Sequence, residues 1–289
     1  MPESAPSVSL GDFEITLIQD GVYWWDGGAV FGVVPKTLWN QKLPADELNR
    51  VPLAFNCYLV RTDGHTILIE TGGGDKMDSR ARERMRMPAE PSRLPEVIAR
   101  AGVDPESVDL VINSHLHWDH CSGNTVKCGG GVAAAFPRAR YFAPRAEWEH
   151  AHERNPRDSV SYIDANYDPL VENGRMILVD DGHVVVPGVT MHRAPGHNRD
   201  MMVVTVESQG AAFCFLSDLV PGVAHLQPTW IPAFDLFPLE SIETRTTWLR
   251  KAVEGDWLLG LGHDCGQPFV RIRADEKQKF ALKQSATDN

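Results

Sequence analysis

Long apolar runs and an excess of positive charge are both missing from this chain of 289 residues. No stretch of about 18 apolar residues occurs, so the sequence predicts no transmembrane helix. Lys and Arg number 28 against 39 Asp and Glu, which gives a net charge of −11. Nucleic acids and anionic membranes bind basic surfaces, and we therefore expect neither as a partner.

Cysteine is also scarce, and its spacing indicates no disulfide framework. The chain has five cysteines, an odd number, and no Cys-x-x-Cys pair. The N-terminus has neither a basic segment nor an apolar segment of the kind found in signal peptides. Reduced thiols and the lack of an export signal together predict a cytoplasmic protein.

The apolar residues that are present suffice for a sizeable core, since they make up 43% of the chain. Alternating or continuous apolar patterns predict strands at 13–19, 54–61, 65–71, 108–113, 175–179, 189–193, 201–206, 212–217 and 257–261. Helical spacing occurs at 93–101, 145–153 and 239–253, and the polar tail after about residue 275 is expected to fray. Strands interspersed with helices favour one α/β domain over residues 1–289, with sheets inside and helices outside.

An aromatic, glycine-rich segment at about 22–40 fits neither a clean strand nor a clean helix. It contains Trp24, Trp25, Phe31 and Trp39. One interpretation is a lid that places Trp24, Trp25 and Phe31 on an apolar substrate pocket. The other is an arm that forms a homodimer, because large apolar patches usually mark interfaces.

The strongest chemical signal is the run Ser-His-Leu-His-Trp-Asp-His at 114–120, directly after an apolar strand. On an extended chain His115, His117 and Asp119 point to one side. A turn or helix start at 119–121 would bring His120 back to the same cavity. Imidazole and carboxylate groups suit zinc, iron or manganese, so we predict a metal site at this strand end.

Three later residues have the same context, a ligand-type side chain just past an apolar strand. They are His197, Asp218 and His263. Strand ends that share one sheet edge can converge in space, so these residues are candidates for the remaining ligands.

In this order of motifs the sequence resembles the metallo-β-lactamase superfamily. The run His-x-His-x-Asp-His, then Pro-Gly-His, Ser-Asp and a late His carry the resemblance over about residues 10–272. It implies an αββα sandwich with a dinuclear metal site at the sheet edge. His115, His117 and His197 would hold one metal, Asp119, His120 and His263 the other, and Asp218 would bridge them.

A narrower similarity is to the quorum-quenching lactonases and methyl-parathion-hydrolase-like enzymes. The stretches 55–57, 70–72, 217–221, 224–225 and 234–238 resemble that branch. The chain departs from it at Glu70, where Asp is usual, at 198–202, where a second His or Gln is frequent, and at Pro221, where a tyrosine is expected. Glu70 could still accept a hydrogen bond from a ligand imidazole.

Together these features predict a metal-dependent hydrolase of a small, uncharged ester or lactone. Two divalent metals, zinc first and iron, manganese or cobalt as alternatives, would supply the nucleophile. Asp119, Asp218 and His225 are the candidate proton donors to the leaving group. Trp118, Trp230 and Phe234 would join the aromatic segment in the pocket. The alternatives are a phosphotriesterase-like hydrolase and an iron-dependent redox enzyme on the same fold.

Overall fold

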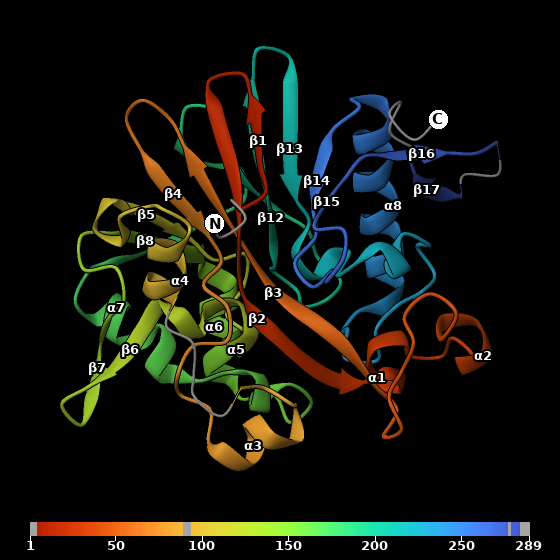
Figure 1. Ribbon diagram of the computed structural model, residues 1–289, viewed down its shortest axis with the longest axis horizontal. Helices are drawn as coiled ribbons and strands as arrows, with labels where there is room; N and C mark the ends of the chain where they lie inside the picture. Colours follow the sequence, from red (N-terminus) through yellow and green to blue (C-terminus); the bar gives the residue numbers. More distant parts are fainter. Residues whose placement is uncertain (1–4, 89–93, 277–278, 284–289) are drawn as a thin grey trace.

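Two β-sheets lie face to face in the middle of the molecule, and helices cover their outer faces (Figure 1). The structure is a computed structural model that describes residues 5–88, 94–276 and 279–283. The first sheet has the strand order β1-β2-β3-β4-β5-β8-β9, and the second has the order β10-β11-β12-β13-β14-β15. The αββα sandwich predicted from the resemblance is therefore confirmed.

The strands of the first sheet come from the first 179 residues. They are β1 (Ser7–Leu10), β2 (Phe13–Asp26), β3 (Arg50–Arg61), β4 (Thr66–Ile69), β5 (Leu110–Ile112), β8 (Arg140–Pro144) and β9 (Met176–Val179). The same half contains several helices and a hairpin. The helices are α3 (Ser79–Arg84), α4 (Leu94–Arg100), α5 (Trp118–Cys121), α6 (Arg145–Glu153) and α7 (Asp168–Glu172), and the hairpin consists of β6 (Thr125–Cys128) and β7 (Gly131–Ala134).

The second sheet follows in the chain and carries one long helix on its outer face. Its strands are β10 (His183–Val186), β11 (Val189–Arg193), β12 (Met202–Ser208), β13 (Ala211–Phe215), β14 (Leu258–Gly260) and β15 (Phe269–Val270). Helix α8 (Pro238–Glu254) lies beside this sheet, and β16 (Ile272–Ala274) pairs with β17 (Phe280–Leu282) next to it (Figure 1).

Three apolar clusters hold these layers together. Side chains from both sheets, among them Ile15, Tyr58 and Phe213, fill the space between them. A second cluster packs α4, α6 and α7 on the first sheet, and a third packs Trp248 and Leu249 of α8 on the second. Central strands such as β12 and β13 are buried on both faces, so they are continuous apolar runs that could be predicted from the sequence.

The aromatic segment 22–40 has a definite structure that the sequence pattern did not predict. Strand β2 continues to Asp26, and two short helices follow, α1 (Gly27–Phe31) and α2 (Lys36–Trp39). Phe31 and Trp39 stack on each other and are buried within the chain. These two side chains are therefore not part of an exposed apolar patch, the feature from which a dimer arm was predicted.

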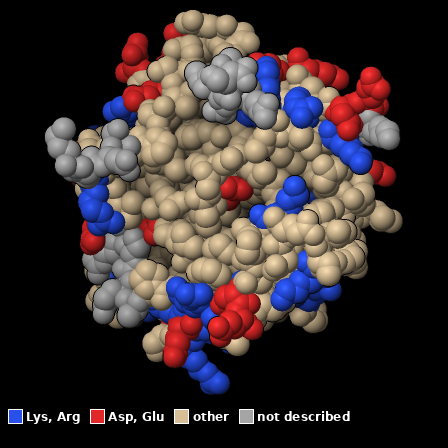
Figure 2. All heavy atoms as spheres, turned by 45° about the vertical axis from the view of Figure 1, so that its right-hand side comes forward, with Lys and Arg blue, Asp and Glu red and all other residues tan. Residues whose placement is uncertain are grey.

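Charged side chains gather mainly around the rim of the face that Figure 2 brings forward, and its middle is largely uncharged. Among the described helices, none combines the length and the apolar character that a membrane span requires. The last six residues of the predicted polar tail, 284–289, lie outside the described residues.

Candidate metal centre

The run 114–120 begins two residues beyond strand β5 and continues into helix α5. His117 caps this helix at its N-terminus, and the helix then turns His120 back toward the strand end. As a result the ring centroids of His115 and His120 lie 4.1 Å apart. Both rings, and that of His117, are buried. A short helix thus gathers side chains that an extended chain would place on opposite sides.

The later candidates come from three strand ends of the second sheet. His197 follows β11, Asp218 lies in a 3₁₀ turn (Ser217–Leu219) after β13, and His263 follows β14. Strand β14 runs parallel to β13, and β11 runs in the same direction because β12 is antiparallel to both of its neighbours. The carboxyl ends of all three strands therefore open at one edge of the sheet.

At this edge the candidates form two neighbouring groups. The ligand atoms of His115, His117 and His197 lie within 4.8 Å of one another, and so do those of Asp119, His120 and His263. Asp218 lies between the groups. One of its carboxylate oxygens is 2.9 Å from Nε2 of His263 and 3.2 Å from Nε2 of His120, and the other is 3.3 Å from Nε2 of His197.

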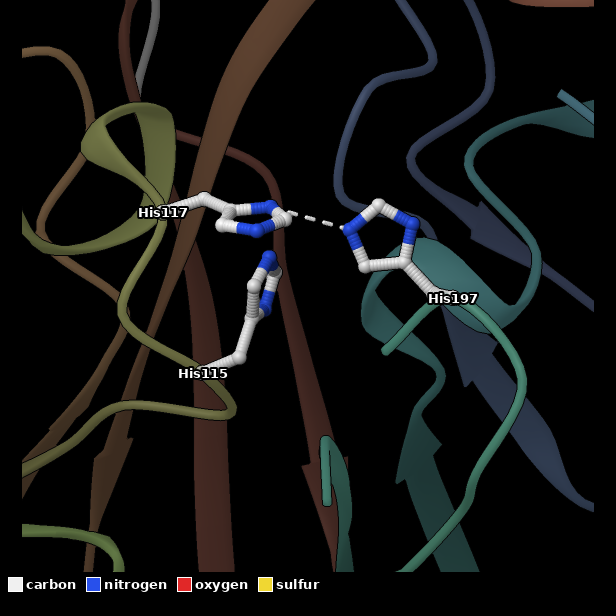
Figure 3. A group of neighbouring side chains, drawn as sticks. All are labelled: His115, His117 and His197. Carbon is white, nitrogen blue, oxygen red and sulfur yellow. Dashed lines mark hydrogen bonds between the residues drawn. The ribbon is translucent and has the colours of Figure 1, made fainter. Parts of the chain in front are cut away.

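Two of these ring nitrogens are buried without a hydrogen-bond partner, as expected of side chains that can bind a cation. They are Nε2 of His115 and Nε2 of His117. Figure 3 shows His115 and His117 on one segment and His197 facing them from another, with 3.0 Å between Nδ1 of His117 and Nε2 of His197. Imidazole nitrogens and carboxylate oxygens in this arrangement fit a divalent metal.

The electrostatics of the cluster centre on Asp218. Burial opposes ionisation of this carboxyl, but the imidazoles of His120, His263 and His197 hold its pKa well below the ordinary value. Burial likewise opposes protonation of His120, yet Asp218 and Asp119 raise its pKa well above normal. His115 differs, because burial and the neighbouring His120 keep its pKa well below normal.

Both histidine candidates of the second sheet have a partner on Nδ1 that orients the ring. Nδ1 of His197 is 3.0 Å from Oδ1 of Asp235, and Oδ2 of Asp235 accepts a hydrogen bond of 2.6 Å from the Ser241 hydroxyl. Nδ1 of His263 is 2.8 Å from the main-chain oxygen of Ala54. Such partners fix the tautomer and the ring orientation of a metal-binding histidine.

Glu70, predicted as an acceptor for a ligand imidazole, lies beside the cluster. Its Oε1 accepts a hydrogen bond from the main chain of Ser114 and is 3.7 Å from Nδ1 of His120. The distance between Glu70 and His120 is thus within the range of an ion pair but longer than that of a hydrogen bond.

Sequence reasoning missed two side chains that contact the candidates. Asp235 lies in the stretch 234–238 that carries the family resemblance, so a signal for it existed. Tyr23 had none: from strand β2, 96 positions earlier in the chain, its hydroxyl donates a hydrogen bond of 2.8 Å to Oδ2 of Asp119. Burial raises the pKa of this phenol well above its ordinary value, and the charge of Asp119 adds to the effect.

A cavity of about 350 Å³ opens over the candidates. It is lined by three of the predicted pocket residues, Trp25, Trp118 and Phe234. The structure does not bring the other three to it: Trp24 stacks with Arg86, Phe31 packs on Trp39, and Trp230 lines a second cavity of about 710 Å³. Tyr23, Leu53 and residues of the segment 157–161 also line it.

His225, a candidate proton donor, also borders the second cavity rather than the first. Its Nε2 is 3.1 Å from the main-chain oxygen of Val30, and its ring stacks on Phe31. Burial and the neighbouring Arg245 lower the pKa of His225 to about 4. Its contacts are those of a packed histidine that joins two segments of the fold.

Comparison with known proteins agrees with this geometry. Residues 51–263 match the Metallo-beta-lactamase superfamily. An N-acyl homoserine lactonase from a Bacillus species is 27% identical over 182 residues. That match covers 59% of this chain and 64% of the relative, so the chain spans less than two thirds of the relative's length.

Solved structures extend the similarity over nearly the whole chain. A probable metal-dependent hydrolase from Staphylococcus aureus has a TM-score of 0.86 and 28% identity, and the match covers 96% of this chain and 99% of that one. A dizinc quorum-quenching lactonase has a TM-score of 0.80 at 18% identity, with 99% of each chain covered, which shows a shared fold. By sequence and by fold, this chain belongs to the metallo-beta-lactamase superfamily.

Proposed function

We propose that this chain is a two-metal hydrolase of small uncharged esters, with lactones as the preferred class. The single observation that carries the proposal is the position of Asp218 between two groups of three ligand candidates. A carboxylate that reaches both groups suits a bridge between two metals. The dizinc lactonase and the N-acyl homoserine lactonases among the similar proteins support the same chemistry.

The residues of the chain divide the work of such a reaction. Two divalent metals, zinc first, would supply a nucleophile derived from water and Lewis-acid activation of the carbonyl group. Trp25, Trp118 and Phe234 would hold the apolar part of the substrate and exclude water. Asp119 and Asp218, both at the cavity, are the candidates that receive the proton of the nucleophile and return it to the leaving oxygen.

The lining of the cavity favours a neutral substrate with an apolar tail. Most of the residues around it are apolar, and Arg157, whose guanidinium also donates to the main-chain oxygen of Ala233, is its one Lys or Arg side chain among the described residues. Each buried CH₂ group contributes about 0.8 kcal/mol, or about fourfold in kcat/KM. We therefore expect kcat/KM to rise along an acyl-chain series until the cavity is full.

The test combines metal analysis with a substrate panel. Gently purified protein should contain about two metal equivalents per chain. The panel comprises acyl homoserine lactones, simple lactones, aryl esters, phosphotriesters, a β-lactam and a thioester, and lactones should react fastest. Asp218→Ala should lose the bridge. Its activity should fall by more than about 100-fold, which is the most that loss of an indirect metal partner costs.

Other outcomes would replace the proposal by a specific alternative. Phosphotriesters that react faster than every lactone would favour the phosphotriesterase-like hydrolase. A chain that binds iron and hydrolyses nothing on the panel would favour the redox enzyme. Full activity of Asp218→Ala would remove this residue from the site.

A further inference from the structure

Tyr23 reaches the metal centre because strand β2 contains a bulge. The pairing of β2 with β3 shifts register between Gln19 and Val22, so that one residue too many lies on β2. Gly21, inside the bulge, has a φ of +148°, a backbone conformation that residues other than glycine rarely adopt. A bulge changes which side chains face a given side of the sheet. After it, Tyr23 lies opposite Leu53, and both residues line the cavity.

Three neighbouring rings hold the phenol ring of Tyr23 in place. Phe55 stacks on it at a centroid distance of 4.6 Å, with an angle of 15° between the planes. Trp118 and His263 contact it edge to face, at 5.4 and 5.9 Å. The residue is 3% exposed. Because the ring cannot move without displacing these neighbours, the position of its hydroxyl is fixed.

The hydroxyl of Tyr23 contacts Asp119, the most exposed ligand candidate in the group of Asp119, His120 and His263. The side chain of Asp119 is 14% exposed, against 2% for His120 and 4% for His263. In residues 5–88, 94–276 and 279–283, Tyr23 is the one hydrogen-bond donor that reaches this carboxylate, at 2.8 Å. The nearest imidazole nitrogens, of His263 and His120, are 3.8 and 3.9 Å away.

We propose that Tyr23 is a positioning residue that holds the carboxylate of Asp119 and so sets the affinity of the metal bound by Asp119, His120 and His263. The inference rests on the proposed two-metal site. A carboxylate on a mobile side chain loses rotational freedom when it binds a metal, and a fixed donor removes part of that cost beforehand. Tyr23 contacts no member of the His115, His117 and His197 group in the described structure, so its effect should be confined to one metal.

Stepwise zinc titration of the metal-free full chain against a chromophoric chelator tests this assignment. Tyr23→Phe should bind one equivalent as tightly as the wild type and the other about 10- to 100-fold more weakly, the range for indirect metal partners. Tyr167→Phe is the matched control, because Tyr167 also donates to a carboxylate, Asp164, at 3.0 Å. Both of its equivalents should bind as in the wild type.

A double-mutant cycle separates positioning from packing. If Tyr23 acts through Asp119, then Tyr23→Phe should weaken zinc binding no further in an Asp119→Ala background, which has no acceptor for the hydroxyl. Phe55→Leu, which keeps the hydroxyl but removes the stacked ring, should weaken the same equivalent to a smaller degree. Since zinc binding needs no substrate, the titration is independent of which ester the enzyme hydrolyses.

Three results would overturn the assignment. They are unchanged binding of both equivalents by Tyr23→Phe, equal weakening of both, and loss of folding in Tyr23→Phe while Tyr167→Phe folds. A wild-type chain that binds a single equivalent would instead refute the two-metal site, and the role of Tyr23 with it.

Discussion

Asp235 should control the affinity of the other metal, the one assigned to His115, His117 and His197. Its side chain is 1% exposed, and its two oxygens contact Nδ1 of His197 at 3.0 Å and Oγ of Ser241 at 2.6 Å. The charge of Asp235 makes the imidazole a better electron donor, and the hydrogen bond keeps its Nε2 directed at the site.

Two substitutions of Asp235 should weaken zinc binding to different degrees. Main-chain hydrogen bonds from Leu236 to His197 and from Phe237 to Gly196 hold the loop independently of the side chain, so neither substitution should release His197 altogether. Asn can still accept from Nδ1 of His197 and donate to Ser241, so only the charge is lost. Asp235→Asn should therefore weaken one zinc equivalent about 10-fold, and Asp235→Ala, which loses both contacts, about 100-fold. These factors equal about 1.4 and 2.7 kcal/mol.

The assay is the same stepwise zinc titration, with Ser241→Ala as the control that leaves the contact with His197 intact. Ser241→Ala should bind both equivalents nearly as the wild type does. If Asp235→Ala bound two equivalents with wild-type affinity, the reasoning about His197 would be wrong. Equal effects of Asn and Ala would show that the charge, rather than the orientation of the ring, accounts for the whole contribution.

Four further predictions concern stability and assembly. His225→Ala should lower Tm and leave kcat nearly unchanged, since His225 packs on Phe31 outside the site cavity; a loss of kcat at constant Tm would restore it as a proton donor. His150 contacts Asp158 at 2.7 Å, and although burial opposes it, this contact raises the pKa of His150. Below the unfolded-state pKa of about 6.5, the pair should therefore stabilise the fold by at most about 2 kcal/mol. The difference in unfolding free energy between the wild type and His150→Gln should vanish as the pH rises through the folded-state pKa. A difference that grew with pH would contradict this. Chelation of zinc should lower the unfolding free energy by about 2.7 kcal/mol for each site held at 100 times its Kd, measured by denaturant titration with and without chelator. Self-association stays a prediction, with Val33 and Leu38 as exposed apolar residues of segment 22–40, and sedimentation as a monomer at high concentration would exclude it.

The parts of the site that depend on local sequence could be predicted. The run 114–120 follows a strand and turns within one short helix, so its side chains are neighbours for local reasons. His197, Asp218 and His263 were found because each follows an apolar strand, and strands of one direction end at one edge of the sheet. Strands predicted at 54–61 and 65–71 likewise correspond to β3 and β4, which pair antiparallel.

The parts that depend on distant packing could not be predicted. Tyr23 contacts Asp119 across 96 positions of sequence, by way of a bulge that no composition signal marks. His225 was a candidate for the site because the stretch 224–225 resembles the lactonase branch. In the structure a 3₁₀ turn (Val223–His225) and the buried Arg245, which donates to the main-chain oxygens of Leu219 and Trp230, direct this segment toward the second cavity.

The origin of the ligand candidates links metal binding to the assembly of the sandwich. Each of the two proposed metal groups combines residues of the run 114–120 with one histidine of the second half, His197 in one group and His263 in the other. A third group of ligand-type side chains, Glu70, His115 and His120, lies wholly in the first half. The main-chain oxygen of Ala54, on the first sheet, contacts His263 of the second half. Neither proposed group is complete within one half, so the full binding free energy of the two metals would be available only when the two sheets are packed together. Metal affinity and the stability of the interface between the sheets should therefore change together in any variant that loosens either one.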